Sequence, residues 1–472
     1  MTGDGARELR VGALARVEGE GALRLRVGDG GTVTEAQLRI YEPPRFFEAF
    51  LRGRRHTEPP DLTSRVCGIC PIAYQTSACQ AIEDACGITV DGRSAALRRL
   101  LYCGEWIESQ TLHIYLLHAP DFLGCDNAIE LAHDHRTDVE RGLRLKQAGN
   151  TIVELLGGRS IHPVNMRVGG FHRTPTRAEL HPLAERLRQA HDDALGTVAW
   201  VAGFDFPDAE CDADLLALAQ PDTYAIETGI PTVLSHGDGQ RTRTFPLADF
   251  TTHVVEEQVP HSTALQARLD GRRHLTGALA RYAISGHLLP PTVREAARAA
   301  GLADPASGEI CRNPFRSIVV RAVEVLYAVE EALRLIDTYE PPPRPAVDVP
   351  PRAGTGHGAT EAPRGTLYHR YTLDAEGLVT DACLVPPTSQ NQGAIEEDLR
   401  RLVQDRLRQG DATDAELTRL CERAIRNHDP CISCSAHFLD LTVEAAAGRL
   451  DATVGFPDRR HSAGAHSRNL IT

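Results

Sequence analysis

The chain has 472 residues, and its 51 lysine and arginine side chains against 64 aspartate and glutamate side chains give a formal net charge of −13 at pH 7. An acidic chain of this kind is not expected to bind nucleic acid. Residues 1–10 lack an apolar signal core, and no run of about 18 apolar residues predicts a membrane span. We therefore expect a cytoplasmic protein without nucleic-acid or membrane partners.

Two segments with alternating apolar and polar side chains predict β-hairpins. In the first, residues 23–40 alternate around a glycine-rich turn at 28–31, which is typical of two paired strands. In the second, residues 367–373 turn at 376–377 into residues 379–385. One hairpin is therefore expected near the N-terminus and the other in the C-terminal half.

Three segments with helical spacing of apolar residues predict long helices. The first begins at Ser94 and is expected to end at Pro120. The second begins at a capping box over 176–179, and the third opens with the Asn-Pro pair at 313–314. Together with the hairpins, these helices predict a predominantly helical α+β fold around a central bundle of long helices.

A proline-rich segment allows two interpretations. Residues 340–351 contain six prolines and can form neither a helix nor a central strand, so they would ordinarily predict an interdomain linker. However, glycines follow at positions 354, 356 and 358. Glycine-rich backbone can also pass through a site where it must approach a cofactor closely.

Two cysteine pairs share the spacing Cys-x-x-Cys, namely Cys67 with Cys70 and Cys431 with Cys434. Two such pairs supply four thiolates, a soft ligand set that suits zinc, iron or nickel. About 360 residues separate the pairs, whereas structural zinc usually stabilises a small local module. A redox-metal site is therefore favoured, while a structural zinc site and two unrelated pairs remain alternatives. The other eight cysteines show no paired spacing and do not predict an iron–sulfur cluster held by this chain alone.

Several motifs resemble, in the same order, those of the large subunit of nickel–iron hydrogenases. They are Arg16-Val17-Glu18-Gly19, Phe46 to Arg54, the two cysteine pairs, Gly157-Gly158-Arg159, His162-Pro163, Gly169-Gly170, Glu361-Ala362-Pro363-Arg364-Gly365 and Pro387 to Asn391. The resemblance implies the fold of that subunit and its activity, the reversible heterolytic cleavage of H2 into protons and electrons.

The resemblance also implies a nickel–iron centre whose iron carries cyanide and carbon monoxide. By position, Cys67 and Cys431 would be terminal thiolates of nickel, and Cys70 and Cys434 would bridge nickel and iron. H2 is apolar and nearly featureless, so catalysis must polarise its bond between a metal and a nearby base.

Five further residues take roles by position in the same resemblance. Arg364 would stand over the open metal position, and Asp429 would orient its guanidinium by a bidentate pair. Glu18 would carry protons between a terminal cysteine and the outside. Pro363 and Thr388 would lie near the cyanide ligands.

A second metal ion is implied beside the bimetallic centre. Glu48 and His437 match the family's ligands for a magnesium ion, or an iron ion in its place, and the carbonyl group of Leu384 would complete the set. Ser109 and Gln110 stand where other members have aspartate and histidine. We therefore expect different hydrogen bonding around Arg364.

The resemblance further implies partners and processing. The run Cys-Gly-Ile-Cys-Pro-Ile-Ala-Tyr-Gln is similar to the cytosolic, NAD(P)-linked and sulfhydrogenase-like branch. In an enzyme of this branch, the electrons from H2 would pass through a small iron–sulfur subunit, and then through diaphorase-type flavin and iron–sulfur subunits, to NAD(P). Residues 1–437 would form a single domain, and a maturation protease would remove residues 438–472 by a cut after His437. A hydrogen sensor and a non-catalytic subunit of an electron-transfer complex with the same fold are alternatives.

Overall fold

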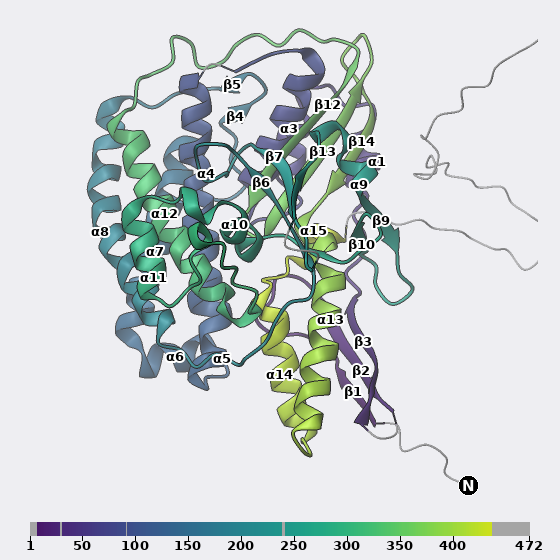
Figure 1. Ribbon diagram of the computed structural model, residues 1–472. Coiled ribbons are helices and arrows are strands. Elements are labelled where there is room, and N and C mark those ends of the chain that lie inside the picture. The colour runs from purple at the N-terminus through teal and green to yellow at the C-terminus, as the bar shows by residue number, and fades with distance from the viewer. Residues whose placement is uncertain (1–6, 29–30, 91, 238–240, 437–472) are drawn as a thin grey trace, which may run out of the picture. The chain divides into compact units, whose positions relative to one another are not determined.

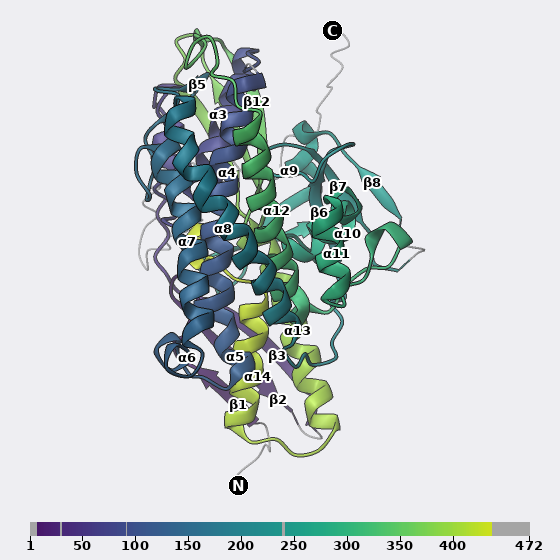
Figure 2. The same ribbon diagram turned by 90° about the vertical axis from the view of Figure 1, so that its left-hand side faces the viewer.

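The computed structural model describes residues 7–28, 31–90, 92–237 and 241–436, and these belong to one compact unit. Four long helices lie side by side as a bundle, and most of the small β-sheets lie to one side of it (Figure 1). The turned view separates the bundle from the strands β6, β7 and β8 (Figure 2), which span Asp214–Ala219, Ile230–Leu234 and Thr242–Thr244. The predicted α+β class with a central helical bundle is confirmed. None of the helices in the described part of the chain combines the length and apolar character that a bilayer span requires.

The bundle consists of α4 (Gly92–Leu112), α7 (Arg136–Gly157), α8 (Arg177–Ala202) and α12 (Ser317–Asp337). The predicted capping box begins α8, because the side chains of Thr176 and Glu179 each bond the other's backbone N–H. Asn313 caps a 3₁₀ turn over Pro314–Arg316 that leads into α12. The helices α4 and α7 touch at Gly149, where a Cβ atom would lie 2.6 Å from a backbone nitrogen of α4.

The end of the first long helix differs from the prediction. Helix α4 does not stop at Pro120 but passes into a π-helical turn over His113–His118, and α5 (Ala119–Leu123) follows directly. Pro120 lies in the first turn of α5, where the missing N–H of proline leaves no helical bond unmade. This proline therefore marks the start of a helix and not its end.

Both predicted hairpins are confirmed, and each belongs to a three-stranded antiparallel sheet. The N-terminal sheet contains β1 (Arg7–Val11), β2 (Gly21–Val27) and β3 (Val33–Ile40), and the second sheet contains β12 (Gly354–Ala362), β13 (Gly365–Leu373) and β14 (Val379–Val385). Leu23, Leu25 and Leu38 bury the apolar face of the first sheet against α13 (Pro387–Arg408) and α14 (Asp414–Asn427).

The glycines before the second hairpin bring a strand against a helix. Strand β12 crosses α3 (Pro71–Cys86) so closely that a Cβ atom at Gly356 would lie 2.1 Å from the carbonyl oxygen of Ala81. The preceding proline segment follows the short β4–β5 hairpin, because Phe171 N–H donates to the Pro345 carbonyl group at 2.8 Å. It therefore packs within the compact unit and does not link two described domains.

The remaining elements complete the unit. The short strands are β4 (Met166–Arg167), β5 (Gly170–Phe171), β9 (Val254–Gln258), β10 (Leu265–Leu269) and β11 (His274–Leu275). The short helices are α1 (Phe47–Leu51), α2 (Pro59–Thr63), α6 (Ala128–Asp134), α9 (Phe250–His253), α10 (Ala278–Ser285), α11 (Pro291–Ala299) and α15 (Ile432–Ser435). The first cysteine pair precedes α3, and the second lies at α15.

Candidate metal centre

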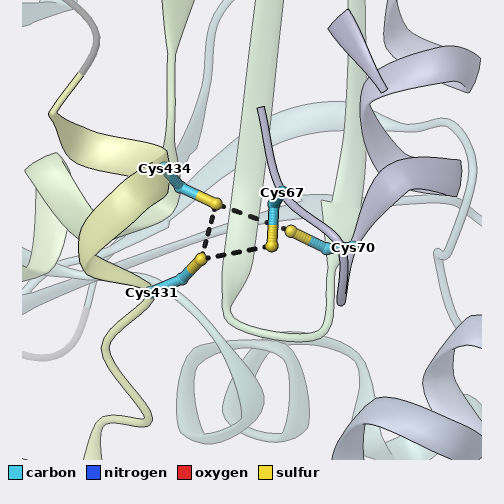
Figure 3. Close-up of side chains that lie close together, drawn as sticks. All are labelled: Cys67, Cys70, Cys431 and Cys434. Carbon is cyan, nitrogen blue, oxygen red and sulfur yellow. Dashed lines mark hydrogen bonds between the residues drawn. The ribbon is translucent and has the colours of Figure 1, made fainter. Parts of the chain in front are cut away.

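The two cysteine pairs meet in the interior, and their sulfur atoms point toward one another (Figure 3). The Sγ atoms of Cys67 and Cys431 lie 3.4 Å apart, and those of Cys70 and Cys434 lie 3.6 Å apart. All four residues are buried, and their sulfur atoms lie within 4.8 Å of one another. The interpretation as two unrelated pairs is therefore wrong. Because zinc, for example, binds thiolate sulfur at about 2.3 Å, sulfur atoms this close together can share a metal centre.

The second cysteine pair is held by residues far away in the sequence. Ile432 N–H donates to the Glu18 carbonyl group at 3.0 Å, and Cys431 N–H donates to the Thr388 hydroxyl group at 3.0 Å. Asp429, two residues earlier, has a left-handed backbone with φ of 50°. These contacts fix the C-terminal segment between the N-terminal sheet and the start of α13.

The first cysteine pair is held by a buried carboxylate that the sequence analysis missed. Cys70 occupies the N-cap position of α3, but its side chain makes no capping bond. Instead Glu105, from α4, accepts the N–H groups of Ile72 at 2.6 Å and Ala73 at 3.2 Å. Glu105 thus satisfies the start of α3 and leaves the Cys70 sulfur directed at Cys434. The available signal was a charged residue among the buried positions of a predicted helix.

The thiols differ in how readily they ionise. Hydrogen bonds from the neighbouring thiols, first that of Cys431, lower the pKa of Cys67 well below its usual value. Burial raises the pKa of Cys431 and of Cys434. Binding a metal ion to all four sulfurs must therefore displace protons from thiols that hold them tightly, which makes metal binding dependent on pH.

Arg364 is buried beside the cysteines, with 2 % of its surface exposed. Its Nε donates to the Asp429 carbonyl group at 2.9 Å. The Asp429 carboxylate also faces the guanidinium, with Oδ2 at 3.3 Å from Nε and Oδ1 at 3.3 Å from Nη2. The Ser109 hydroxyl group is a weaker neighbour at 3.5 Å. Although burial opposes the charge, the Asp429 carboxylate raises the pKa of Arg364 well above its usual value. A fixed positive charge therefore stands next to the four sulfurs.

Glu18 connects the cysteines with the outside of the unit. Its Oε2 accepts the Cys431 thiol at 3.0 Å and the Ser433 N–H at 3.1 Å, and the side chain is half-buried. Burial, and then the negative charge of Cys67, raises the pKa of Glu18. This carboxyl group can accept a proton from a thiol that points into the site.

Glu48 and Leu384 are brought together, because Glu48 Oε1 accepts the Leu384 N–H at 2.7 Å. Glu48 lies on α1 and is buried. Their predicted companion His437 lies outside the described residues. Pro363 directly precedes Arg364, and Thr388 contacts Cys431 as described above.

A family model described as nickel-dependent hydrogenase matches residues 45–141 and 311–437. Sulfhydrogenase 1 subunit alpha of Pyrococcus furiosus is 33 % identical over 439 residues, which cover 92 % of this chain and 98 % of that protein. This chain belongs to the nickel-dependent hydrogenases. Subunit beta of the NAD-reducing hydrogenase HoxS of Cupriavidus necator is 28 % identical, with 94 % of this chain and 99 % of that protein covered.

Solved structures give the same result for the hydrogenase fold. An NAD⁺-reducing [NiFe]-hydrogenase in the H2-reduced state superposes with a TM-score of 0.81 at 26 % identity, covering 91 % of this chain and 99 % of that chain. A Ni-Fe-Se hydrogenase from D. vulgaris Hildenborough shares the fold at 22 % identity, with a TM-score of 0.77 and coverage of 92 % and 100 %.

The hydrogenase is thus an oxidoreductase that acts on H2, and the chain corresponds to the large subunit. Family membership makes nickel, and not structural zinc, the metal expected in this site. The buried set of four cysteines fits a nickel–iron centre.

Proposed function

We propose that this chain is the catalytic large subunit of a cytosolic nickel–iron hydrogenase whose electrons pass through partner subunits to NAD(P). The observation that carries the proposal is the convergence of four buried sulfurs beside Arg364 and Glu18. Relatives named as a sulfhydrogenase and as an NAD-reducing hydrogenase support the choice of branch.

In this proposal, Cys67 and Cys431 would be terminal thiolates of nickel, and Cys70 and Cys434 would be shared between nickel and iron. When bound, a centre with cyanide and carbon monoxide on its iron supplies an open position at which the H2 bond is polarised. Thr388 bonds the Cys431 N–H and Pro363 directly precedes Arg364, and both would contact the cyanide ligands. The chemistry of the donors supports this assignment, since four thiolates are soft ligands for both metals.

The residues around the sulfurs would divide the remaining work. The Arg364 guanidinium, oriented by Asp429, holds a positive charge and hydrogen-bond donors beside the centre without a need to reorganise during turnover. A proton that H2 cleavage delivers to the Cys431 sulfur would pass from Sγ to Glu18 Oε2, which lies 3.0 Å away. Because Glu18 is half-buried, its carboxyl group then releases the proton toward the outside.

We also propose that Glu48, His437 and the Leu384 carbonyl group bind a magnesium ion, or an iron ion in its place. Carboxylate and carbonyl oxygens are the ligands that Mg²⁺ prefers. The support is that Glu48 and Leu384, 336 residues apart in the sequence, lie in direct contact.

Electrons would leave beside the first cysteine pair. Gly68, between Cys67 and Cys70, is exposed, and a Cβ atom there would lie 4.0 Å from a methyl carbon of Ile161. Ile161 is itself 58 % exposed, so apolar surface borders an exposed backbone position between two of the four cysteines. We assign this surface to the small iron–sulfur subunit, with the diaphorase-type subunits beyond it.

The substitution Ile161→Glu tests that assignment. A buried charge in an interface core should weaken association with the small subunit at least about tenfold, measured by co-purification and by titration of the separated subunits. Ile129→Glu is the matched control, because Ile129 is also an exposed isoleucine but lies on α6. Equal affinities for the two variants would contradict the assignment.

One sample of active enzyme purified from its host tests the proposed function as a whole. It should contain nickel and iron, lack stoichiometric zinc, reduce a dye with H2, and hold a large subunit whose mass ends at His437. Zinc without nickel, or metals without H2-dependent reduction, would contradict the proposed function. An active chain of 472 residues would contradict only the predicted removal of residues 438–472.

A further inference from the structure

Arg281, on α10, lies beneath the backbone that carries Arg364 and is 1 % exposed. Its Nε and one terminal nitrogen each donate to a Glu324 carboxylate oxygen at 2.7 Å. The other terminal nitrogen, Nη1, donates to Glu361 at 3.1 Å and to the Ala362 carbonyl group at 2.9 Å, and Nη2, which also bonds Glu324, donates to the Pro363 carbonyl group at 3.0 Å. All five N–H donors of the guanidinium are therefore engaged.

These bonds reach the tight turn from which Arg364 projects. Ala362 pairs with Gly365 at the end of the β12–β13 hairpin, so Pro363 and Arg364 form the turn itself. The other side of the turn rests on Gly277, where a Cβ atom would lie 2.8 Å from the Arg364 carbonyl oxygen. The backbone before Arg364 is thus fixed by Arg281, and the backbone after it is fixed by close packing.

The carboxylates that face Arg281 are themselves held in place. Glu361 Oε1 accepts the Leu218 N–H and the Thr366 hydroxyl group, each at 2.7 Å. The Trp106 ring stacks on the guanidinium, with 4.6 Å from its Cζ atom to the ring centroid, and Trp106 Nε1 donates to the Glu361 carbonyl group at 2.8 Å. The cluster therefore has one hydrogen-bonded arrangement.

Stability alone is a poor reason for such a cluster. Removing charges from water costs several kcal/mol per ion, and well-packed apolar residues often stabilise a core as well or better. A bidentate, fully engaged guanidinium instead defines positions of backbone atoms. Here the positions it defines are those of the two residues before Arg364.

We propose that Arg281 is a positioning residue of the hydrogenase, which sets the place of Arg364 over the four cysteines by holding the Ala362 and Pro363 carbonyl groups. The inference rests on the proposed function, because it requires a metal centre beneath Arg364. A displacement of Arg364 by about 1 Å is enough to slow turnover up to about 100-fold.

The test compares Arg281→Lys with Arg99→Lys in the complete enzyme. Arg99 is a matched buried arginine, with bonds to Glu331, Glu227 and Tyr327. Lysine has three donors at one point and cannot reproduce either set of bonds. Both variants should lower the unfolding temperature. Only Arg281→Lys should shift the infrared bands of the iron-bound carbon monoxide and cyanide and lower kcat about 10- to 100-fold, with nickel and iron retained.

The outcomes separate a failure of the proposed function from a failure of the role proposed for Arg281. A wild-type enzyme without nickel or without these infrared bands overturns the proposed function and this inference with it. If the wild type has the bands and both lysine variants keep them at wild-type frequencies and rates, only the inference is overturned. If Arg281→Lys does not fold or loses nickel, Trp106→Phe replaces it, since it removes one bond to Glu361 and leaves a smaller aromatic ring beside the Arg281 guanidinium. In the Trp106→Phe enzyme, bands that shift from the wild-type frequencies support the inference, and unshifted bands overturn it.

Discussion

Replacing Cys434 by alanine is expected to abolish nickel retention and H2-dependent dye reduction together. The substitution leaves three of the four sulfurs that converge in the site, and a smaller set binds soft metal ions far less tightly. Loss of a group that merely supports a metal ligand costs about 10- to 100-fold in metal affinity or activity, so loss of a ligand should exceed that range. Nickel per chain and the rate of dye reduction are the measurements.

The control for this substitution is Cys421→Ala. Cys421 is a buried thiol on α14 that lies outside the set of four sulfurs, and burial raises its pKa to about 12. Cys421→Ala should therefore keep its nickel and its rate. A Cys434→Ala enzyme with a full complement of nickel would show that the four sulfurs are not the ligand set.

Replacing Glu18 by glutamine is expected to lower kcat for H2 oxidation about 100-fold or more. Glutamine keeps the size of the side chain and an oxygen for the Ser433 N–H, but its amide cannot take the proton that the Cys431 thiol offers to Glu18 Oε2. Nickel content and KM for H2 should stay unchanged, because H2 binding does not involve this group. Steady-state kinetics with metal analysis provide the measurement.

Glu35→Gln is the matched control for the proton carrier. Glu35 lies on β3 of the adjoining sheet and pairs with Arg26 at 3.6 Å, away from the cysteines. The Glu35→Gln substitution should leave kcat and KM for H2 unchanged. Full turnover in the Glu18→Gln enzyme would mean that protons leave the site by another path, while a joint loss of rate and nickel would mean that Glu18 supports the ligand set.

Local sequence patterns predicted helices and strands well where the deciding contacts lie within a few residues of one another. The capping box at Thr176 and Glu179 and the alternation around the first hairpin each involve contacts within a few residues, and both are present. Pro120 was misjudged for a local reason, since a proline at the start of a helix and one after its end share the same sequence signal.

The supports of the site could not be predicted in the same way. Glu105 and Arg281 are single charged residues in amphipathic segments, and such residues are usually solvated. Their partners lie 32 to 82 positions away in the chain, so no local pattern distinguishes a buried support from a surface charge. The four cysteines were recognisable as a candidate ligand set because their spacing and the resemblance agreed, whereas the buried charges that support the site became visible only when the chain was folded.

The distance between the two cysteine pairs also has a consequence for biosynthesis. At about 5–20 residues per second, a ribosome needs roughly 20–70 s to add the residues between Cys70 and Cys431. During that interval Cys67 and Cys70 exist as an open pair of thiols, because the α15 segment that covers them has not been made. The nascent chain must therefore remain reduced, and free of adventitious metal, until the α15 segment has been made.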